Sequence, residues 1–284
     1  SFDRGIEARP LPFYRELCYN VSRAILGIPQ NHNWQIPRHG GFPPLGIDKE
    51  DIFMHKSIGI LGGMGPMATA DLFQKIVALT KADSDNDHIR IYIDNNPQIP
   101  DRTTAILKGG KDPVPQMLDA LRHLEACGAD CIVMPCNTAH YFLDRLQPET
   151  KIPFISILEP TAKACAAAHP GKTACILATT GTLCTGIYEK ALSQEGVACL
   201  LPGDRHREIL MDGIYRIKAG ERLTDPAPFQ GMLEDLQAAG ADYFILGCTE
   251  LPLAVEQLSL SGSFIDPTLE LAKAAIRFCG GEIK

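Results

Sequence analysis

The sequence has no run of apolar residues that approaches the roughly 18 residues needed to span a membrane. Its N-terminal residues carry charges and lack the apolar segment of a secretory signal. Basic residues are not in excess either, because 27 Lys and Arg stand against 34 Asp and Glu, for a formal net charge of −7. These absences argue against membranes and nucleic acids as partners, and they predict a cytoplasmic protein.

Signatures of metal and nucleotide binding are also missing. None of the ten cysteines forms a C-x-x-C pair, the spacing typical of structural zinc sites. The glycine-rich stretch "GGMGP", which begins at Gly62, lacks both the Lys-Ser/Thr of a P-loop and a full G-x-G-x-x-G. We therefore expect no metal or nucleotide cofactor, and we interpret most of the cysteines as reduced thiols in apolar surroundings.

What the chain does contain is two copies of one pattern. "GADCIVMPCNT" begins at Gly128 and "GADYFILGCTE" begins at Gly240, and Cys136 and Cys248 stand at the same place in each copy. The offset far exceeds the about 20–50 residues of a solenoid unit, so it indicates two similar domains. In each copy a helix leads through a glycine turn into a short apolar strand and then a loop that carries cysteine.

Strands and helices alternate from Ser57 onward, which predicts parallel sheets covered by helices on both faces. The expected fold is α/β, with a first domain over 57–158 and a second over 159–265. The C-terminal segment 266–284 carries a helix that could pack back on the first domain. An N-terminal extension over 1–56 precedes them, with an amphipathic helix over 11–27 and a Pro- and Gly-rich linker over 28–51.

Polar or glycine-rich stretches follow five of the predicted strands. They are "GGMGPMAT", "DNNPQIPDRTT", "PCNTAH", "ATTGT" and "GCTE". Ligands of open parallel sheets bind beyond the carboxyl ends of the strands, so a cleft between the two domains would bring these stretches together. Cys136 and Cys248 would then lie on opposite sides of a small ligand.

Two facing thiols suit the inversion of a carbon centre. A racemase removes a proton from one face of Cα and returns one to the other, which a thiolate and a thiol can do in turn. The carbanion needs positioned donors for its carboxylate. The side chains that could supply such hydrogen-bond donors are those of Asn137, Thr138, Thr182 and Thr249.

The chain resembles the cofactor-independent aspartate/glutamate racemases, most closely the aspartate racemases, from about Lys56 to Lys284. The motifs that carry the resemblance are "GILGGMGPMAT", "PQIPDRTTAIL", "PCNTAH", "ATTGT", "GIYRIKAG" and "GCTEL". The resemblance implies two α/β domains, a homodimer, no pyridoxal phosphate, and Cys136 and Cys248 as acid and base. It implies a small acidic amino acid, aspartate or glutamate, as the substrate.

The resemblance also implies a set of substrate contacts. They are Met64, Arg102, Thr103, Thr104, Asn137, Thr138, Ala139 and Lys218. The alternatives are a surface charge for Arg102 and a solvated helix position for Lys218. His140 could serve as a base or as a hydrogen-bonding structural residue. For the whole chain, a dicarboxylate isomerase or decarboxylase on the same scaffold and a catalytically silent binding protein stay open.

Overall fold

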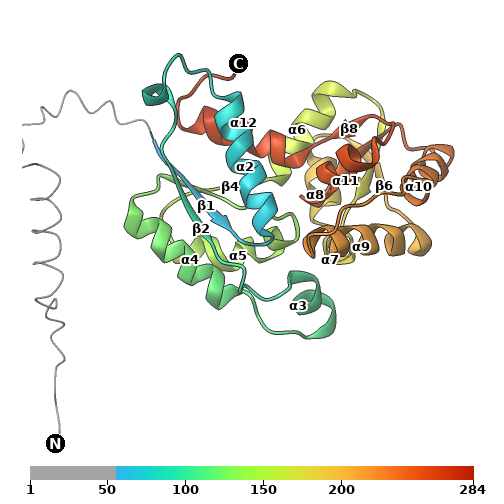
Figure 1. Cartoon of the computed structure of the whole chain (residues 1–284), viewed down its shortest axis with the longest axis horizontal. Coiled ribbons are helices and arrows are strands. Elements are labelled where there is room, and N and C mark those ends of the chain that lie inside the picture. Colours follow the sequence, from blue (N-terminus) through green and yellow to red (C-terminus); the bar gives the residue numbers. More distant parts are fainter. Residues whose placement is uncertain (1–55) are drawn as a thin grey trace, which may run out of the picture. The chain divides into compact units, whose positions relative to one another are not determined.

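The computed structural model describes residues 56–284 (Figure 1). The helix predicted over 11–27 and the linker predicted over 28–51 lie outside the described residues. Within the described part, no helix is long and apolar enough to cross a membrane.

Two parallel four-stranded sheets form the frame of the molecule, which confirms the predicted α/β class. The first has the strand order β2-β1-β3-β4 and the second has the order β6-β5-β7-β8. The strands are β1 (Ile58–Gly62), β2 (Ile91–Asn95), β3 (Cys131–Val133), β4 (Phe154–Ile155), β5 (Thr173–Leu177), β6 (Ala198–Leu200), β7 (Tyr243–Leu246) and β8 (Phe264–Ile265).

The two sheets are built by the same connections, as the internal repeat predicts. In each, the first strand is central and pairs in parallel with the second and third strands, as Ile58 does with Ile91 and with Cys131. The strands β1, β3 and β7 are buried throughout, because both faces of each sheet are covered. We call the part built on β1–β4 the first half and the part built on β5–β8 the second half.

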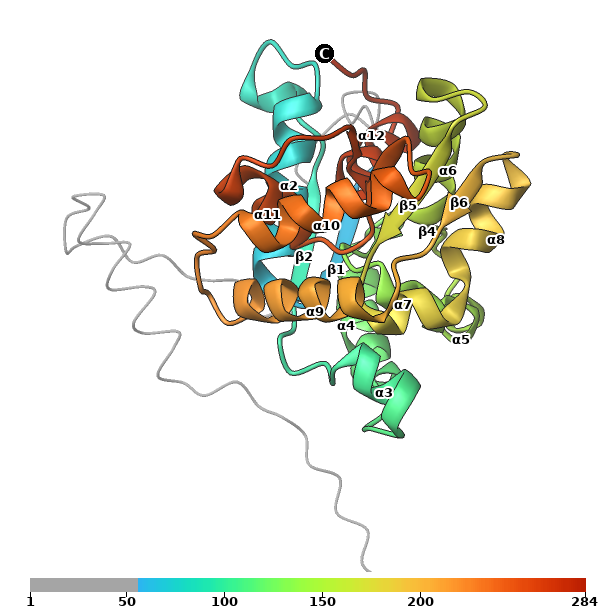
Figure 2. The same cartoon turned by 90° about the vertical axis from the view of Figure 1, so that its right-hand side faces the viewer.

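Helices cover both faces of each sheet. The longer ones are α2 (Pro66–Leu79), α4 (Val114–Cys127), α6 (Leu158–Ala168), α8 (Ile187–Gln194), α9 (Asp204–Lys218), α10 (Ala227–Ala238), α11 (Leu251–Leu258) and α12 (Pro267–Phe278). α4 covers one face of the first sheet, and α2 and α12 pack side by side on the other (Figure 1). In the second half, α9, α10 and α11 share one core while α6 and α8 share the other (Figure 2).

Several short elements at the carboxyl ends of the strands differ from the sequence prediction. The helices α3 (Arg102–Lys108) and α7 (Thr180–Thr185) fall in stretches read as loops, and α6 and α11 were not predicted either. The stretch after Cys136 forms a 3-10 turn, η2 (Thr138–Phe142), followed by the single turn α5 (Leu143–Leu146), where the sequence pattern of 138–147 predicts one helix. α3 and α7 are held by local caps: Asp101 accepts from the Thr104 N–H at 2.7 Å, and Thr179 accepts from the Thr182 N–H at 3.2 Å.

Candidate active site

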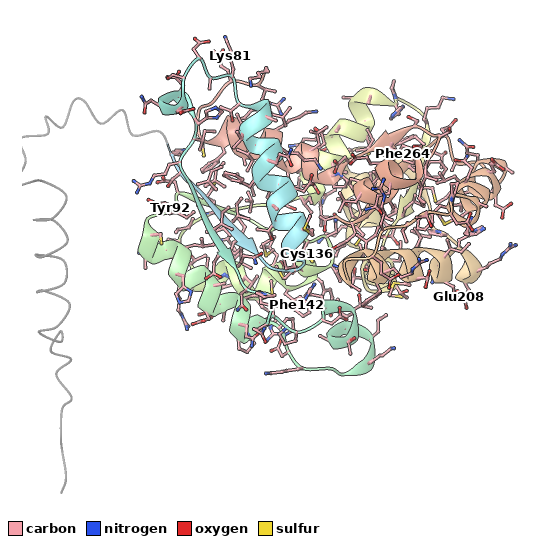
Figure 3. The ribbon with its side chains drawn as sticks, viewed as in Figure 1. Lys81, Tyr92, Cys136, Phe142, Glu208 and Phe264 are labelled. Carbon is pink, nitrogen blue, oxygen red and sulfur yellow. The ribbon has the colours of Figure 1, made fainter. Side chains whose placement is uncertain are left out.

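A small cavity lies at the carboxyl ends of the strands, between the two halves. The space between its lining atoms, including the part open to solvent, is about 300 Å³. Both halves line it, through Met64, Asp101, Arg102, Thr103, Cys136, Asn137 and Thr138 from the first and Thr179, Tyr215, Lys218, Cys248, Thr249 and Glu250 from the second. Figure 3 shows Cys136 where the two halves meet.

The two thiols of the repeat open onto this one cavity. Cys136 lies just beyond β3 and Cys248 just beyond β7, and each residue is only 6% exposed. Both are free cysteines. Two protein thiols therefore approach the same small volume from different halves of the fold.

Glu250, which the sequence prediction missed, connects Cys248 to a lysine. One carboxylate oxygen accepts a hydrogen bond from Cys248 Sγ at 3.0 Å, and the other accepts from Lys218 Nζ at 2.6 Å. Burial raises the pKa of the Cys248 thiol well above its usual range, and the negative charge of Glu250 adds to this while Lys218 opposes it. Cys248 is therefore a neutral thiol that donates to Glu250 in this arrangement.

Lys218 lies at the end of α9 and reaches across the cavity. Its ammonium is also 3.4 Å from the Met64 carbonyl oxygen in the first half. Burial alone would lower the pKa of Lys218, but the negative charge of Glu250 and the hydrogen bond that it accepts act in the opposite direction, and the pKa is raised. The side chain is charged, and Glu250 balances that charge.

Arg102 brings a second positive charge. Despite the burial of the neighbouring Asp101 carboxylate, hydrogen bonds from Thr104 and the charge of Arg102 lower the pKa of Asp101, so this carboxylate offsets part of the Arg102 charge. The Arg102 guanidinium donates to the backbone carbonyls of Ile99 at 3.2 Å, Pro100 at 3.1 Å and Met64 at 2.9 Å. It forms no salt bridge with a carboxylate of the described residues, although the residue is only 8% exposed. A buried guanidinium that forms no salt bridge with a protein carboxylate suits an anionic ligand.

The loop after Cys136 is held by the second half. Thr138 Oγ1 shares hydrogen bonds with Thr179 Oγ1 at 2.9 Å and with Thr182 Oγ1 at 2.8 Å. Asn137 Nδ2 is buried and has no hydrogen-bond partner among the described residues. The residue next to Cys136 lines the cavity and therefore carries an amide donor without a partner in the described part of the chain.

Nine of the twelve residues predicted for the site line the cavity, and the other three lie elsewhere. Met64, Arg102, Thr103, Cys136, Asn137, Thr138, Lys218, Cys248 and Thr249 line it. Thr104 is exposed and its hydroxyl donates to Asp101 at 2.8 Å, Ala139 packs in the core of the first half, and Thr182 supports Thr138.

The lining residues that sequence reasoning missed are Asp101, Thr179, Tyr215 and Glu250. Alignment of the two cysteine motifs was the available signal for Glu250, because it stands two residues after Cys248 as Thr138 does after Cys136.

His140 has a structural place behind Cys136. Its Nδ1 donates to the Cys136 carbonyl at 2.9 Å and its Nε2 accepts from the Ile157 N–H at 3.0 Å, which fixes a neutral tautomer. Burial lowers the pKa of His140 to about 4 from 6.5. This arrangement favours the hydrogen-bonding alternative over the role of catalytic base.

We expect His140 to make the fold sensitive to acid. Because its pKa is lowered in the folded state, the unfolded chain binds more protons between pH 6.5 and 4, and stability falls as the pH falls through that window. The contribution amounts to about 2 kcal/mol between pH 7 and pH 5. Urea unfolding at the two pH values should show this loss in the native protein and a smaller one in His140→Gln. Equal losses in both proteins would contradict it.

Nothing in the described part of the chain suggests a metal site, since no three His, Cys, Asp or Glu side chains gather as a metal ion would require.

The chain matches the family model described as Asp/Glu/hydantoin racemase over residues 61–275. It is 30% identical over 226 residues to the broad specificity amino-acid racemase RacX of Bacillus subtilis, covering 77% of this chain and 96% of that protein.

Solved structures show the same fold. Aspartate racemase from Picrophilus torridus superposes with a TM-score of 0.69 at 30% identity, covering 81% of this chain and 96% of that one. A putative Asp/Glu racemase from Yersinia pestis gives a TM-score of 0.66 at 26% identity, with 79% and 99% covered.

Proposed function

The chain belongs to the Asp/Glu/hydantoin racemase family, and its similarity to amino-acid racemases of that family supports the same class of activity. We propose that it interconverts L- and D-aspartate, with Cys136 and Cys248 as the acid/base pair. One observation carries the proposal: two buried thiols from the two copies of the repeat line a single small cavity, which the positively charged side chains of Arg102 and Lys218 also line. Glutamate is the second choice of substrate, since it differs by one methylene.

The free donors of the cavity support an acidic amino acid. Asn137 Nδ2 lacks a partner, and a buried polar group left unsatisfied costs about 1–3 kcal/mol, which a substrate carboxylate would relieve. The Arg102 guanidinium would take the other carboxylate. Glu250 is a buried carboxylate suited to the α-ammonium of the substrate.

The proton transfers follow from the placement of the thiols. A thiolate on one face takes the α-proton, the C–H bond breaks, and its electron pair moves into the α-carboxylate. The thiol on the opposite face then gives its proton to Cα, which inverts the centre and exchanges the roles of the two sulfurs. Because Cys248 is protonated in this arrangement, its thiol is placed to act as the proton donor.

The chemistry needs no cofactor, because deprotonation relies on the thiols and on electrostatic stabilisation of the carbanion. Incubation of either enantiomer in D₂O, with EDTA and a carbonyl-trapping reagent present, tests this. We expect deuterium at Cα and a racemic product by chiral chromatography. Loss of activity that returns on adding pyridoxal phosphate or a divalent metal would contradict cofactor independence.

The same experiment separates the other reactions of this scaffold. A decarboxylase would release CO₂, a dicarboxylate isomerase would leave both aspartate enantiomers unchanged, and a binding protein would exchange no deuterium. Inversion with solvent exchange is expected from the racemase alone.

A further inference from the structure

Tyr188 connects the second half to the loop that carries the first thiol. It lies in the first turn of α8, is fully buried, and packs in the core that α6 and α8 share. Its hydroxyl donates to Asn137 Oδ1 at 2.5 Å. A side chain of the second half therefore ends on the residue next to Cys136.

The ring of the same tyrosine contacts the loop of the second thiol. A Cβ at Gly247, the residue before Cys248, would lie 3.3 Å from Tyr188 Cε2 and 3.1 Å from Ala178 Cβ. A side chain at 247 would crowd both neighbours, so the glycine lets this loop pack closely on the ring. Tyr188 thus lies against both cysteine loops at once.

The hydrogen bond decides which way the Asn137 amide faces. A side-chain amide has an acceptor at one end and two donors at the other, and Tyr188 occupies the acceptor. The donor atom Nδ2 is left without a partner, in a residue that is 2% exposed and lines the cavity. Burial raises the pKa of Tyr188 well above its usual value, so the hydroxyl keeps its proton and stays a donor.

We propose that Tyr188 is a positioning residue, whose hydroxyl fixes the Asn137 amide so that Nδ2 donates to a carboxylate of the bound ligand. The inference rests on the proposed function for the identity of that ligand, an amino acid. In this way a tyrosine of the second half helps to position the carboxylate-binding amide of the first half. Without the hydroxyl the amide is free to turn and to present its oxygen to the carboxylate, which repels it.

A purely structural tyrosine would have the same burial, so the test needs a matched control. Tyr243 of β7 is also fully buried and belongs to the same core. It does not line the cavity. Tyr188→Phe and Tyr243→Phe each remove one buried hydroxyl and keep the ring, although the Tyr243 hydroxyl has no hydrogen-bond partner among the described residues. Thermal unfolding of each variant measures the stability that the substitution itself removes, and we expect Tyr243→Phe to remove less.

In racemisation of aspartate, Tyr188→Phe should lower kcat/KM about tenfold, the effect of one misaligned hydrogen bond, mainly by raising KM. Tyr243→Phe should stay within about twofold of the native protein. In an Asn137→Ala background, Tyr188→Phe should add no further loss, because its effect acts through the amide. A full additional tenfold loss there would overturn the inference while leaving the proposed function intact.

Alkylation of Cys136 gives a readout that does not depend on racemisation. Iodoacetate carries a carboxylate and iodoacetamide does not, so the ratio of their rates at Cys136, measured by peptide mass spectrometry, reports carboxylate recognition beside the thiol. The ratio should fall severalfold in Tyr188→Phe and stay unchanged in Tyr243→Phe. An unchanged ratio in both variants would overturn the inference. If the ratio falls in Tyr188→Phe but the native protein does not racemise aspartate, the inference about Tyr188 stands and the proposed function is rejected.

Discussion

Cys136→Ser and Cys248→Ser are each expected to abolish racemisation, with a loss of at least about 10³-fold in kcat/KM. A hydroxyl is a far weaker acid than a thiol, so serine supplies neither a base nor a ready proton donor on its face of Cα. The loss must be equal in the two directions, because the enantiomers have the same free energy in water. Chiral chromatography of the product from each enantiomer measures it.

The remaining thiol gives each variant a second, directional signature. With one base left, only the enantiomer whose Cα–H faces that sulfur can lose its proton, and the proton returns to the same face. In D₂O the two variants should therefore exchange the α-hydrogen of opposite enantiomers without inversion. Cys184→Ser is the matched control, since this exposed cysteine of α7 does not line the cavity.

Two results would contradict the two-thiol mechanism. Full turnover in either variant would remove that cysteine from the chemistry. Exchange of the same enantiomer in both variants would place the two sulfurs on one side of the substrate.

The frame of the molecule could be predicted from the sequence because its signals are local. Apolar runs such as "CIVM" and "YFIL" become buried strands, and the glycine that follows each preceding helix is in the left-handed region, with φ of 85° at Gly128 and 107° at Gly240. The rule that parallel strands bind ligands at their carboxyl ends then predicts one cleft for Cys136 and Cys248. The cavity between the halves agrees with that expectation.

The charge pattern of the site could not be predicted, because it depends on side chains that are distant in the sequence. Lys218 is expected from the sequence to contact the substrate, but Glu250, which is distant in the sequence, pairs with it at 2.6 Å. Asp101 and Tyr215 also meet across the cavity, at 3.2 Å between the hydroxyl and the carboxylate. Neighbouring positions diverge as well: Thr103 is buried and Thr104 is exposed, since α3 directs them to different sides.

These pairings leave Arg102 as the cation that should distinguish aspartate from neutral amino acids. Lys218 is balanced by Glu250, whereas Arg102 contacts only backbone carbonyls among the described residues. A buried guanidinium that forms no salt bridge favours a substrate carboxylate and disfavours an apolar or amide side chain, which would leave it without an ionic partner. We therefore expect Arg102→Ala to lower kcat/KM for aspartate about 100-fold, in keeping with the roughly 1.5–3 kcal/mol of a charged hydrogen bond.

The comparison with a neutral substrate separates recognition from packing. Arg102 also holds the Met64 carbonyl, so its loss disturbs the loop for every substrate. Asparagine has the shape of aspartate without the charge, and α-deuteration in D₂O detects even its slow turnover. The ratio of kcat/KM for aspartate over asparagine should fall about tenfold or more in Arg102→Ala, and Arg102→Lys should recover part of it because the charge is kept without the planar fork. An equal loss for both substrates would mean that Arg102 acts on the loop alone, and a native enzyme that racemises alanine as fast as aspartate would overturn the acidic substrate itself.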